Sequence, residues 1–230
     1  MTAGASWSRR IRDRIIAHWL LKMLGTTAGI TAFMWLYFLL LLNPQFPVTI
    51  MPLTPLDRWI GFEPWTLLPY ASLWLYISLV PALLLRHEFA PYLRAVALLS
   101  IAGLGIFLLF PTAVPAPAID WTRYPTVQFL KSVDASGNAC PSLHVAFSVL
   151  TAIWLNRLLH HIGAPRALTL ANAGWCLLIV YSTLATKQHV AIDAASGALL
   201  GVIIAFAQLR ALPWPAARRA SVLEPTPLDV

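Results

Sequence analysis

Two short segments contain the residue types that phosphoryl transfer requires. They are Cys140-Pro141-Ser142-Leu143-His144 and Lys187-Gln188-His189-Val190-Ala191-Ile192-Asp193, and each adjoins a long apolar run. Titratable groups at the edge of a membrane span are costly to keep, so they usually serve a function. Histidine can act as a nucleophile or as a general acid and base, while serine and lysine can hold phosphate oxygens.

The spacing of the two histidines predicts that they share one face of a membrane. His189 follows His144 by 45 positions, which allows two crossings of about 20 residues each. Asp193 follows His189 by four positions, and residues at this spacing share a helix face. Its carboxylate can accept the Nδ1 proton of His189, which leaves Nε2 available as a nucleophile.

A phosphate site is expected next to these histidines. Pro141 and Ser142 precede an apolar run, and the free N–H groups of a helix start, together with a serine hydroxyl, bind anions. Lys187 adds a positive charge beside His189. Arg123 and Lys131 lie in the segment that leads to His144, and they are further candidates for contact with substrate.

The composition is that of an integral membrane protein. Of the 230 residues, 59% are apolar and 11% are charged, whereas a soluble domain is nearer half apolar and a quarter charged. The mean hydropathy of +0.71 agrees. The net charge of +7 fits cations held on the cytoplasmic face. Nucleic acid is not expected as a partner, because no basic patch alternates with solvent-facing aromatic residues.

The apolar runs predict an all-α, polytopic bundle of six transmembrane helices. They lie at 23–42, 67–85, 95–110, 143–159, 168–186 and 190–209. A basic cytoplasmic segment, 1–22, precedes the membrane domain, 23–212, and a proline-rich tail, 213–230, follows it. Apolar residues at helical spacing within 1–22 allow a short helix on the membrane surface or a charged flank that sets orientation.

The basic residues predict that both termini are cytoplasmic. With the N-terminus inside, only four of the 16 lysines and arginines fall in outer segments, namely Arg58, Arg123, Lys131 and Lys187. The histidine pair then lies on the outer face, and we expect a bacterial inner membrane or an equivalent one. The proline-rich outer connection 43–66 is expected to cap this face with a short helix, and the connection 111–141 is expected to be non-helical.

The two segments resemble motifs of a known family. Residues 140–146 and 182–193 are similar to the second and third signature motifs of the type 2 phosphatidic acid phosphatase (PAP2) superfamily, P-S-G-H and S-R-x5-H-x3-D. The leucine before His144 resembles the branch that includes inositol phosphorylceramide synthases and related bacterial proteins. The six-span layout of the chain is similar to that of the family.

The resemblance implies a role for each matched residue. His189 is the implied nucleophile that forms a phosphohistidine, and Asp193 orients it. His144 protonates the leaving oxygen and then activates the acceptor, while Ser142 holds the phosphoryl group. The resemblance implies neither a metal nor another cofactor.

Two departures concern the cations of the family motifs. Thr183 stands where the third motif has arginine, and Lys187 is expected to supply that charge. Arg123-Tyr124-Pro125 is the nearest match to the first motif, K-x6-R-P, but no lysine stands seven residues before Arg123.

Several functions remain open at this point. The first is a phosphatase for a lipid phosphate or diphosphate, because water needs no second binding site. A lipid head-group phosphotransferase is the alternative that Leu143 favours. A non-catalytic transporter with a histidine proton relay would need polar residues through its spans, and 190–209 offers only Asp193, Ser196 and Gln208. A haem or zinc site of His144, His189 and Asp193 would bring bound metal with it.

Overall fold

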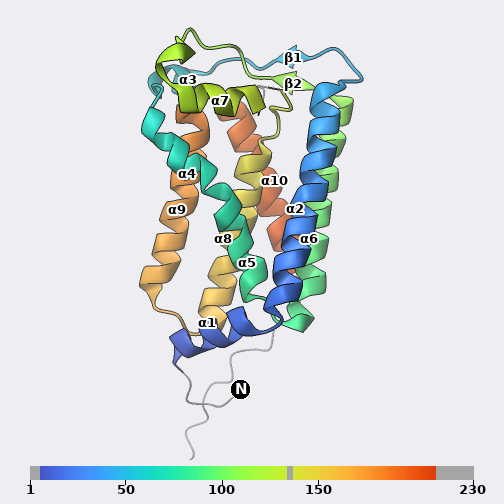
Figure 1. The fold of residues 1–230 in the computed structure, drawn as a ribbon, viewed down its shortest axis with the longest axis vertical. Helices are drawn as coiled ribbons and strands as arrows, with labels where there is room; N and C mark the ends of the chain where they lie inside the picture. The colour runs from blue at the N-terminus through green and yellow to red at the C-terminus, as the bar shows by residue number, and fades with distance from the viewer. Residues whose placement is uncertain (1–5, 134–136, 211–230) are drawn as a thin grey trace, which may run out of the picture.

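The computed structural model describes residues 6–133 and 137–210. Most of these residues belong to long helices that run side by side along the long axis of the molecule (Figure 1). These helices are α2 (Trp19–Leu42), α4 (Leu67–Ala71) continued by α5 (Leu73–Leu83), α6 (Arg86–Leu109), α8 (Leu143–His161), α9 (Arg166–Ala185) and α10 (Ala191–Arg210). The architecture is therefore all-α, with one two-stranded sheet of four residues at one end.

Five stretches of helix in the described ranges are long and apolar enough to cross a membrane. They are Trp19–Leu42, Pro64–Leu83, Arg86–Leu109, Arg166–Ala185 and Ala191–Arg210, and they indicate an integral membrane protein. The fourth predicted span, 143–159, corresponds to α8, which is not among the five. Polar residues reduce its hydropathy, notably His144, Asn156, Arg157, His160 and His161.

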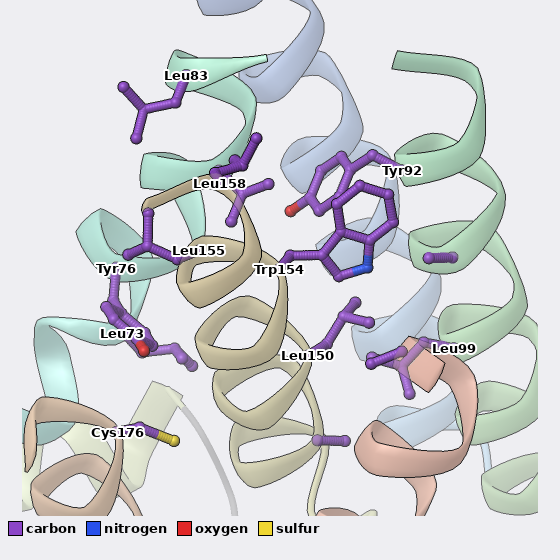
Figure 2. Packing of buried hydrophobic residues seen from close by; sticks show 14 of the residues in the cluster. Leu73, Tyr76, Leu83, Tyr92, Leu99, Leu150, Trp154, Leu155, Leu158 and Cys176 are labelled. Atoms are coloured by element: carbon purple, nitrogen blue, oxygen red, sulfur yellow. The ribbon is translucent and has the colours of Figure 1, made fainter. Parts of the chain in front are cut away.

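The helix α8 is instead the core of the bundle. It packs against α5, α6, α9 and α10, so its side chains contact protein. Figure 2 shows Leu150, Trp154, Leu155 and Leu158 of α8 among buried residues of its neighbours. The Trp154 ring meets the Tyr92 ring of α6 edge to face, with centroids 5.3 Å apart. This packing fixes the first turn of α8, which carries His144.

Helix α1 (Trp7–Ile16) crosses one end of the bundle (Figure 1). A short helix in this basic segment is one of the two alternatives that the sequence allows. Arg14 is buried and donates to the Glu88 carboxylate at 2.7 Å and to the Leu83 carbonyl at 2.9 Å. Because this pair neutralises Glu88, α6 begins at Arg86 rather than at the predicted 95. Helix α2 likewise begins at Trp19 rather than at 23, and the predicted tail 213–230 lies outside the described residues.

The opposite end is covered by the two long connections. The expected short helix in 43–66 is α3 (Pro55–Trp59), and a 3-10 turn, η1 (Pro64–Thr66), leads into α4. Strand β1 (Thr49–Ile50) pairs in parallel with β2 (Thr112–Ala113) of the second connection. That connection is not wholly non-helical, since it also forms η2 (Trp121–Arg123) and α7 (Pro125–Val133). Pro125 suits the first turn of α7, where its missing N–H is not needed.

Candidate active site

His189 and Asp193 form a buried pair at the start of α10. The His189 Nδ1 atom lies 3.2 Å from Asp193 Oδ2, and their side chains are 8% and 0% exposed. The helix begins only at Ala191, so His189 precedes it, and Asp193 sits in its first turn. Asp193 Oδ2 also accepts the Val190 N–H at 3.0 Å, which fixes the carboxylate on the helix terminus. A carboxylate placed there holds the Nδ1 proton and turns Nε2 away from itself.

His144 lies next to this pair, in the first turn of α8. The centroids of the His144 and His189 rings are 5.6 Å apart. The Tyr70 ring stacks on His144 at 4.7 Å, and the Trp74 ring meets it edge-on at 6.4 Å. The two histidines that lie 45 positions apart in the sequence are therefore neighbours, and aromatic residues of α4 and α5 hold His144.

Ser142 links the two helices that carry the histidines. Its N–H donates to the Asp193 carbonyl at 2.9 Å, and its Oγ accepts the Val145 N–H at 3.3 Å as the N-cap of α8. The residue is completely buried. The predicted helix start is thus present, and Ser142 both caps α8 and ties it to the first turn of α10.

The three predicted cations differ in position. Lys187 donates from Nζ to the carbonyls of Asp57, at 3.1 Å, and Ile60, at 2.5 Å, and burial lowers its pKa. Lys131 donates to the Lys187 carbonyl at 3.1 Å, and its Nζ lies 4.8 Å from the centre of the Trp121 ring. Arg123 is 77% exposed and pairs with Asp120 at 3.3 Å. The structure therefore joins Lys187 and Lys131 beside the His189 connection and leaves Arg123 at the surface.

Asp57 belongs to the same site, although no motif in the sequence marks it as a site residue. Its Oδ1 accepts the Ala191 N–H at 2.7 Å, and its Oδ2 accepts the N–H and the hydroxyl of Thr54, each at 2.7 Å. The Thr54-Pro55-Leu56-Asp57 run is a local sign of a helix start. That sign predicts the cap of α3, whereas the contact with α10 comes from the fold.

Comparison with known proteins places the chain in a family. The model of the PAP2 superfamily matches residues 89–216, which is more than half of the chain and includes α8, α9, α10 and both histidine segments. The chain belongs to the PAP2 superfamily. No curated protein and no solved structure matches it. Membership indicates an enzyme of the phosphatase or phosphotransferase type, and the match identifies the superfamily rather than one of its branches.

This PAP2 protein has a long cavity that begins at His144. The cavity has a volume of about 520 Å³ and lies between α2, α5, α6 and the start of α8. Its walls are mainly apolar, with Phe33, Phe38, Ile77, Phe89 and Val96 among them. Lys22 lines the end that is distant from His144. The cavity thus offers a hydrocarbon chain a place directly beside one of the two histidines.

The described part of this PAP2 protein has no group of three or more His, Cys, Asp or Glu residues that could hold a metal ion. His144, His189 and Asp193, the residues considered above as zinc or haem ligands, are neighbours. Their arrangement is not one of a metal site. The carboxylate faces His189 Nδ1.

Proposed function

We propose that the protein is a membrane phosphatase that hydrolyses a lipid phosphate or diphosphate through a phosphohistidine. The proposal is carried by one observation, the contact of the His144 and His189 rings with Asp193 bound to His189 Nδ1. One histidine then has a fixed tautomer for nucleophilic attack, and the other stands beside it as an acid and base.

The reaction consists of two displacements at phosphorus. In the first, His189 Nε2 forms a bond to phosphorus, the bond to the leaving oxygen breaks, and His144 gives that oxygen a proton. In the second, His144 takes a proton from water, the water oxygen attacks phosphorus, and the bond to His189 breaks. Asp193 stabilises the positive imidazole of His189 throughout. Positioning of the groups and stabilisation of charge lower most of the barrier.

The phosphoryl group is proposed to lie among polar groups of the outer connections. The Ser142 hydroxyl and the N-terminal turn of α8 supply donors and a partial positive charge. Lys187 and Lys131, which are linked through the Lys187 carbonyl, supply positive charge. Arg123 contributes least, because it is exposed and paired with Asp120.

The proposed topology has six spans, namely the five apolar stretches and α8, which is the fourth span along the chain. Because α8 is enclosed by four other helices, it does not need the apolar surface that lipid contact requires. Both termini are then cytoplasmic, and the active site faces outward at the end covered by α3 and α7. The substrate chain lies in the bundle with its phosphate at the outer surface of a bacterial inner membrane or an equivalent one.

The phosphotransferase alternative takes a diester lipid as the donor and an alcohol instead of water as the acceptor. That alternative is based on Leu143. The Leu143 side chain is buried and packs closely on Gly103 of α6. A residue in such a packing role does not select an acceptor. Water therefore remains the first choice, and a second assay with a diester lipid and an alcohol tests the transferase.

The test is release of inorganic phosphate by purified protein in detergent with EDTA present. The substrates are phosphatidic acid, phosphatidylglycerol phosphate and a polyprenyl diphosphate. We expect His189→Ala to abolish turnover, and Asp193→Asn to reduce kcat by roughly 10³-fold or more through loss of the correct tautomer. His160→Ala, at the exposed far end of α8, is the matched control and should keep wild-type activity.

The outcomes separate the candidate reactions. Full activity of His189→Ala would refute the phosphohistidine mechanism. Phosphate release that EDTA stops would indicate a metal-dependent reaction instead. If no lipid releases phosphate, but a diester lipid loses its head group to an alcohol, the protein is a phosphotransferase.

A further inference from the structure

The His144 ring is held between aromatic rings that come from one helical segment. The Tyr70 ring lies nearly parallel to it, at 26° and with the centroids 4.7 Å apart, and the Trp74 ring meets it at 71° and 6.4 Å. Ser72, which joins α4 to α5, has helical backbone angles, so Tyr70 and Trp74 are four positions apart on one helix face. The imidazole therefore has a fixed aromatic neighbour on one of its two faces.

Tyr70 is buried outside the cavity that begins at His144. Only 3% of the residue is exposed, and it does not line the cavity, whereas Trp74 and His144 do. A substrate chain in the cavity contacts Trp74 before it could contact Tyr70. The influence of Tyr70 on a reaction therefore passes through the His144 ring.

The segment that carries Tyr70 is fastened to α9 on both sides of this residue. Before it, the Glu63 N–H donates to the Ala185 carbonyl at 3.1 Å. After it, the Trp175 indole N–H donates to Ser72 Oγ at 3.1 Å. These two contacts fix α4 against α9 and therefore fix the place of the Tyr70 ring.

The position of Tyr70 is also tied to the proposed nucleophile. Helix α9 ends at Ala185, and the chain reaches His189 four positions later. The Tyr70 ring, which is fixed relative to α9, lies against His144 of α8. The stack thus connects the helix that leads to one histidine with the ring of the other, and it limits rotation of that ring.

A tyrosine face beside an imidazole favours the protonated form of the imidazole. The face of an aromatic ring attracts a cation that lies within about 6 Å of the ring centre, and the distance between the Tyr70 and His144 centroids is shorter than this. An imidazole must carry its extra proton to act as a general acid. The stack therefore suits the step in which His144 gives up a proton.

We propose that Tyr70 is a positioning residue that holds His144 as the protonated acid for the leaving oxygen. In that step His189 Nε2 forms a bond to phosphorus, the bond from phosphorus to the leaving oxygen breaks, and this oxygen takes the proton from His144. Tyr70 itself is unchanged. The inference rests on the proposed function, and it adds a residue that lies outside both histidine segments.

A substrate whose leaving group needs no proton separates this role from a structural one. Dodecyl phosphate leaves as an alcohol only if an acid protonates its bridging oxygen. S-dodecyl phosphorothioate has sulfur as the bridging atom, and it leaves as a stable thiolate without a proton. Phosphate release from both substrates gives kcat/KM, which reports binding and the first displacement because the leaving group departs in that step.

Three substitutions at Tyr70 test the stack. Tyr70→Leu removes the ring, and Tyr70→Met is a second non-aromatic variant whose flexible side chain can fill the space. We expect both to lower kcat/KM for dodecyl phosphate about tenfold, which is part of the roughly 10²–10⁴-fold that a general acid contributes. The value for the sulfur analogue should stay nearly unchanged. Tyr70→Phe keeps the ring and should recover most of kcat/KM for dodecyl phosphate.

The matched control is Phe107→Leu. Phe107 is a buried residue of α6 whose ring meets Tyr37 edge to face, and it does not line the cavity. Loss of this ring should change kcat/KM for both substrates by the same factor. The thermal unfolding midpoint of each variant, measured on the same preparations, reports the loss of packing separately.

The outcomes distinguish this inference from the proposed function. Equal losses on both substrates in Tyr70→Leu and Tyr70→Met would overturn the inference and leave the phosphatase intact. An equally impaired Tyr70→Phe would also overturn it, because the hydroxyl rather than the stack would then matter. If the loss is specific to dodecyl phosphate but His189→Ala remains active, the phosphohistidine is wrong, while Tyr70 and His144 keep their roles. If wild type releases phosphate from neither substrate nor from phosphatidic acid, both proposals fail.

Discussion

His189 is held by the same short helix on both sides of its position in the chain. Two residues before it, Lys187 donates to the Asp57 and Ile60 carbonyls of the α3 segment. Two residues after it, the Ala191 N–H donates to Asp57 Oδ1 at 2.7 Å. Asp57 is buried, and its carboxylate satisfies a backbone donor that opens α10. We therefore regard Asp57 as a positioning residue for the proposed nucleophile.

Loss of the Asp57 carboxylate should reduce kcat strongly, with only a small loss in the free energy of unfolding. In Asp57→Ala the Ala191 N–H and the Thr54 N–H both lose their acceptor, at a cost of about 0.5–2 kcal/mol for each lost helix cap, and the His189 connection gains freedom. We expect kcat to fall about tenfold or more at nearly constant KM, since a small displacement of a reacting group is costly. Steady-state kinetics and thermal unfolding of the same preparations measure the two effects.

Asp57→Asn keeps an oxygen that can accept the Ala191 N–H, and it should recover much of kcat. Asp120→Ala is the control, because Asp120 also caps a short helix, η2, but lies at the surface. A loss of activity in Asp57→Ala that only follows the loss of folded protein would mean that Asp57 has no positioning role.

At the residue scale, the sequence predicts contacts that depend on short spacing or on counting spans. The four-residue interval between His189 and Asp193 predicts a pair that the structure contains, even though α10 begins after His189. The 45-residue interval between the histidines predicts their proximity. Asp57 and Ala191 are 134 positions apart, and no local pattern connects them. The direction of the Lys187 side chain also depends on the position of the connection 43–66, whose Asp57 and Ile60 carbonyls accept its hydrogen bonds.

At the scale of elements, the site depends on close contact between α8 and α10. Gly197 and Gly201 face α8, and a Cβ atom at Gly201 would lie 2.6 Å from the Ala146 carbonyl oxygen. A Cβ atom at Gly197 would collide with the Ser142 carbonyl oxygen. Small residues four positions apart are typical of helices that pack closely within membranes. This spacing is visible in the sequence, but its partner helix is not.

Gly197→Ala should therefore separate the two helices at the active site. The obstruction is backbone rather than a flexible side chain, so relief requires a shift of α8 relative to α10. We expect a loss of about 1–3 kcal/mol in stability, as in other overpacked cores, and a kcat at least tenfold lower because Ser142 and Asp193 move apart. Activity and thermal unfolding in detergent test this.

Gly174→Ala provides the comparison for Gly197→Ala, since the added methyl group at Gly174 meets nothing within 4 Å. If Gly197→Ala has the wild-type kcat and the wild-type thermal unfolding midpoint, the contact between α8 and α10 tolerates expansion. That contact then does not determine the geometry of the site.

Hydropathy predicts the elements well where lipid contact or solvent determines composition. It places the start of α6 too late, because Glu88 and Arg14 neutralise each other across 74 positions of the chain. It also cannot show that α8 differs from the other spans, because enclosure by neighbours is a property of the bundle. The α7 helix is missed for a related reason, since the prolines near 111–117 dominate the pattern of that connection.

At the scale of the whole molecule, the two ends of the bundle serve different purposes. One end holds α1 and the buried Arg14–Glu88 pair, and Lys22 of the cavity lining donates there to the Arg14 carbonyl. The other end holds α3, α7 and the short sheet (Figure 1), and Asp57 of α3 contacts the start of α10 there. The few basic residues of the second end favour the outer face of the membrane. The proposed reaction then takes place outside the cytoplasm.

This orientation predicts which engineered thiols a membrane-impermeant maleimide reaches in intact cells. In a Cys140→Ser, Cys176→Ala background, Gln45→Cys is exposed at the end that contains α3, and Ala167→Cys is exposed near the start of α9 at the opposite end. We expect Gln45→Cys to react in intact cells and Ala167→Cys to react only after lysis. Phosphate release by each variant verifies that the fold is retained. The reverse pattern would place His144 and His189 on the cytoplasmic side, where the substrate phosphate would have to be presented from the inner leaflet, while the geometry of the histidine pair would be unaffected.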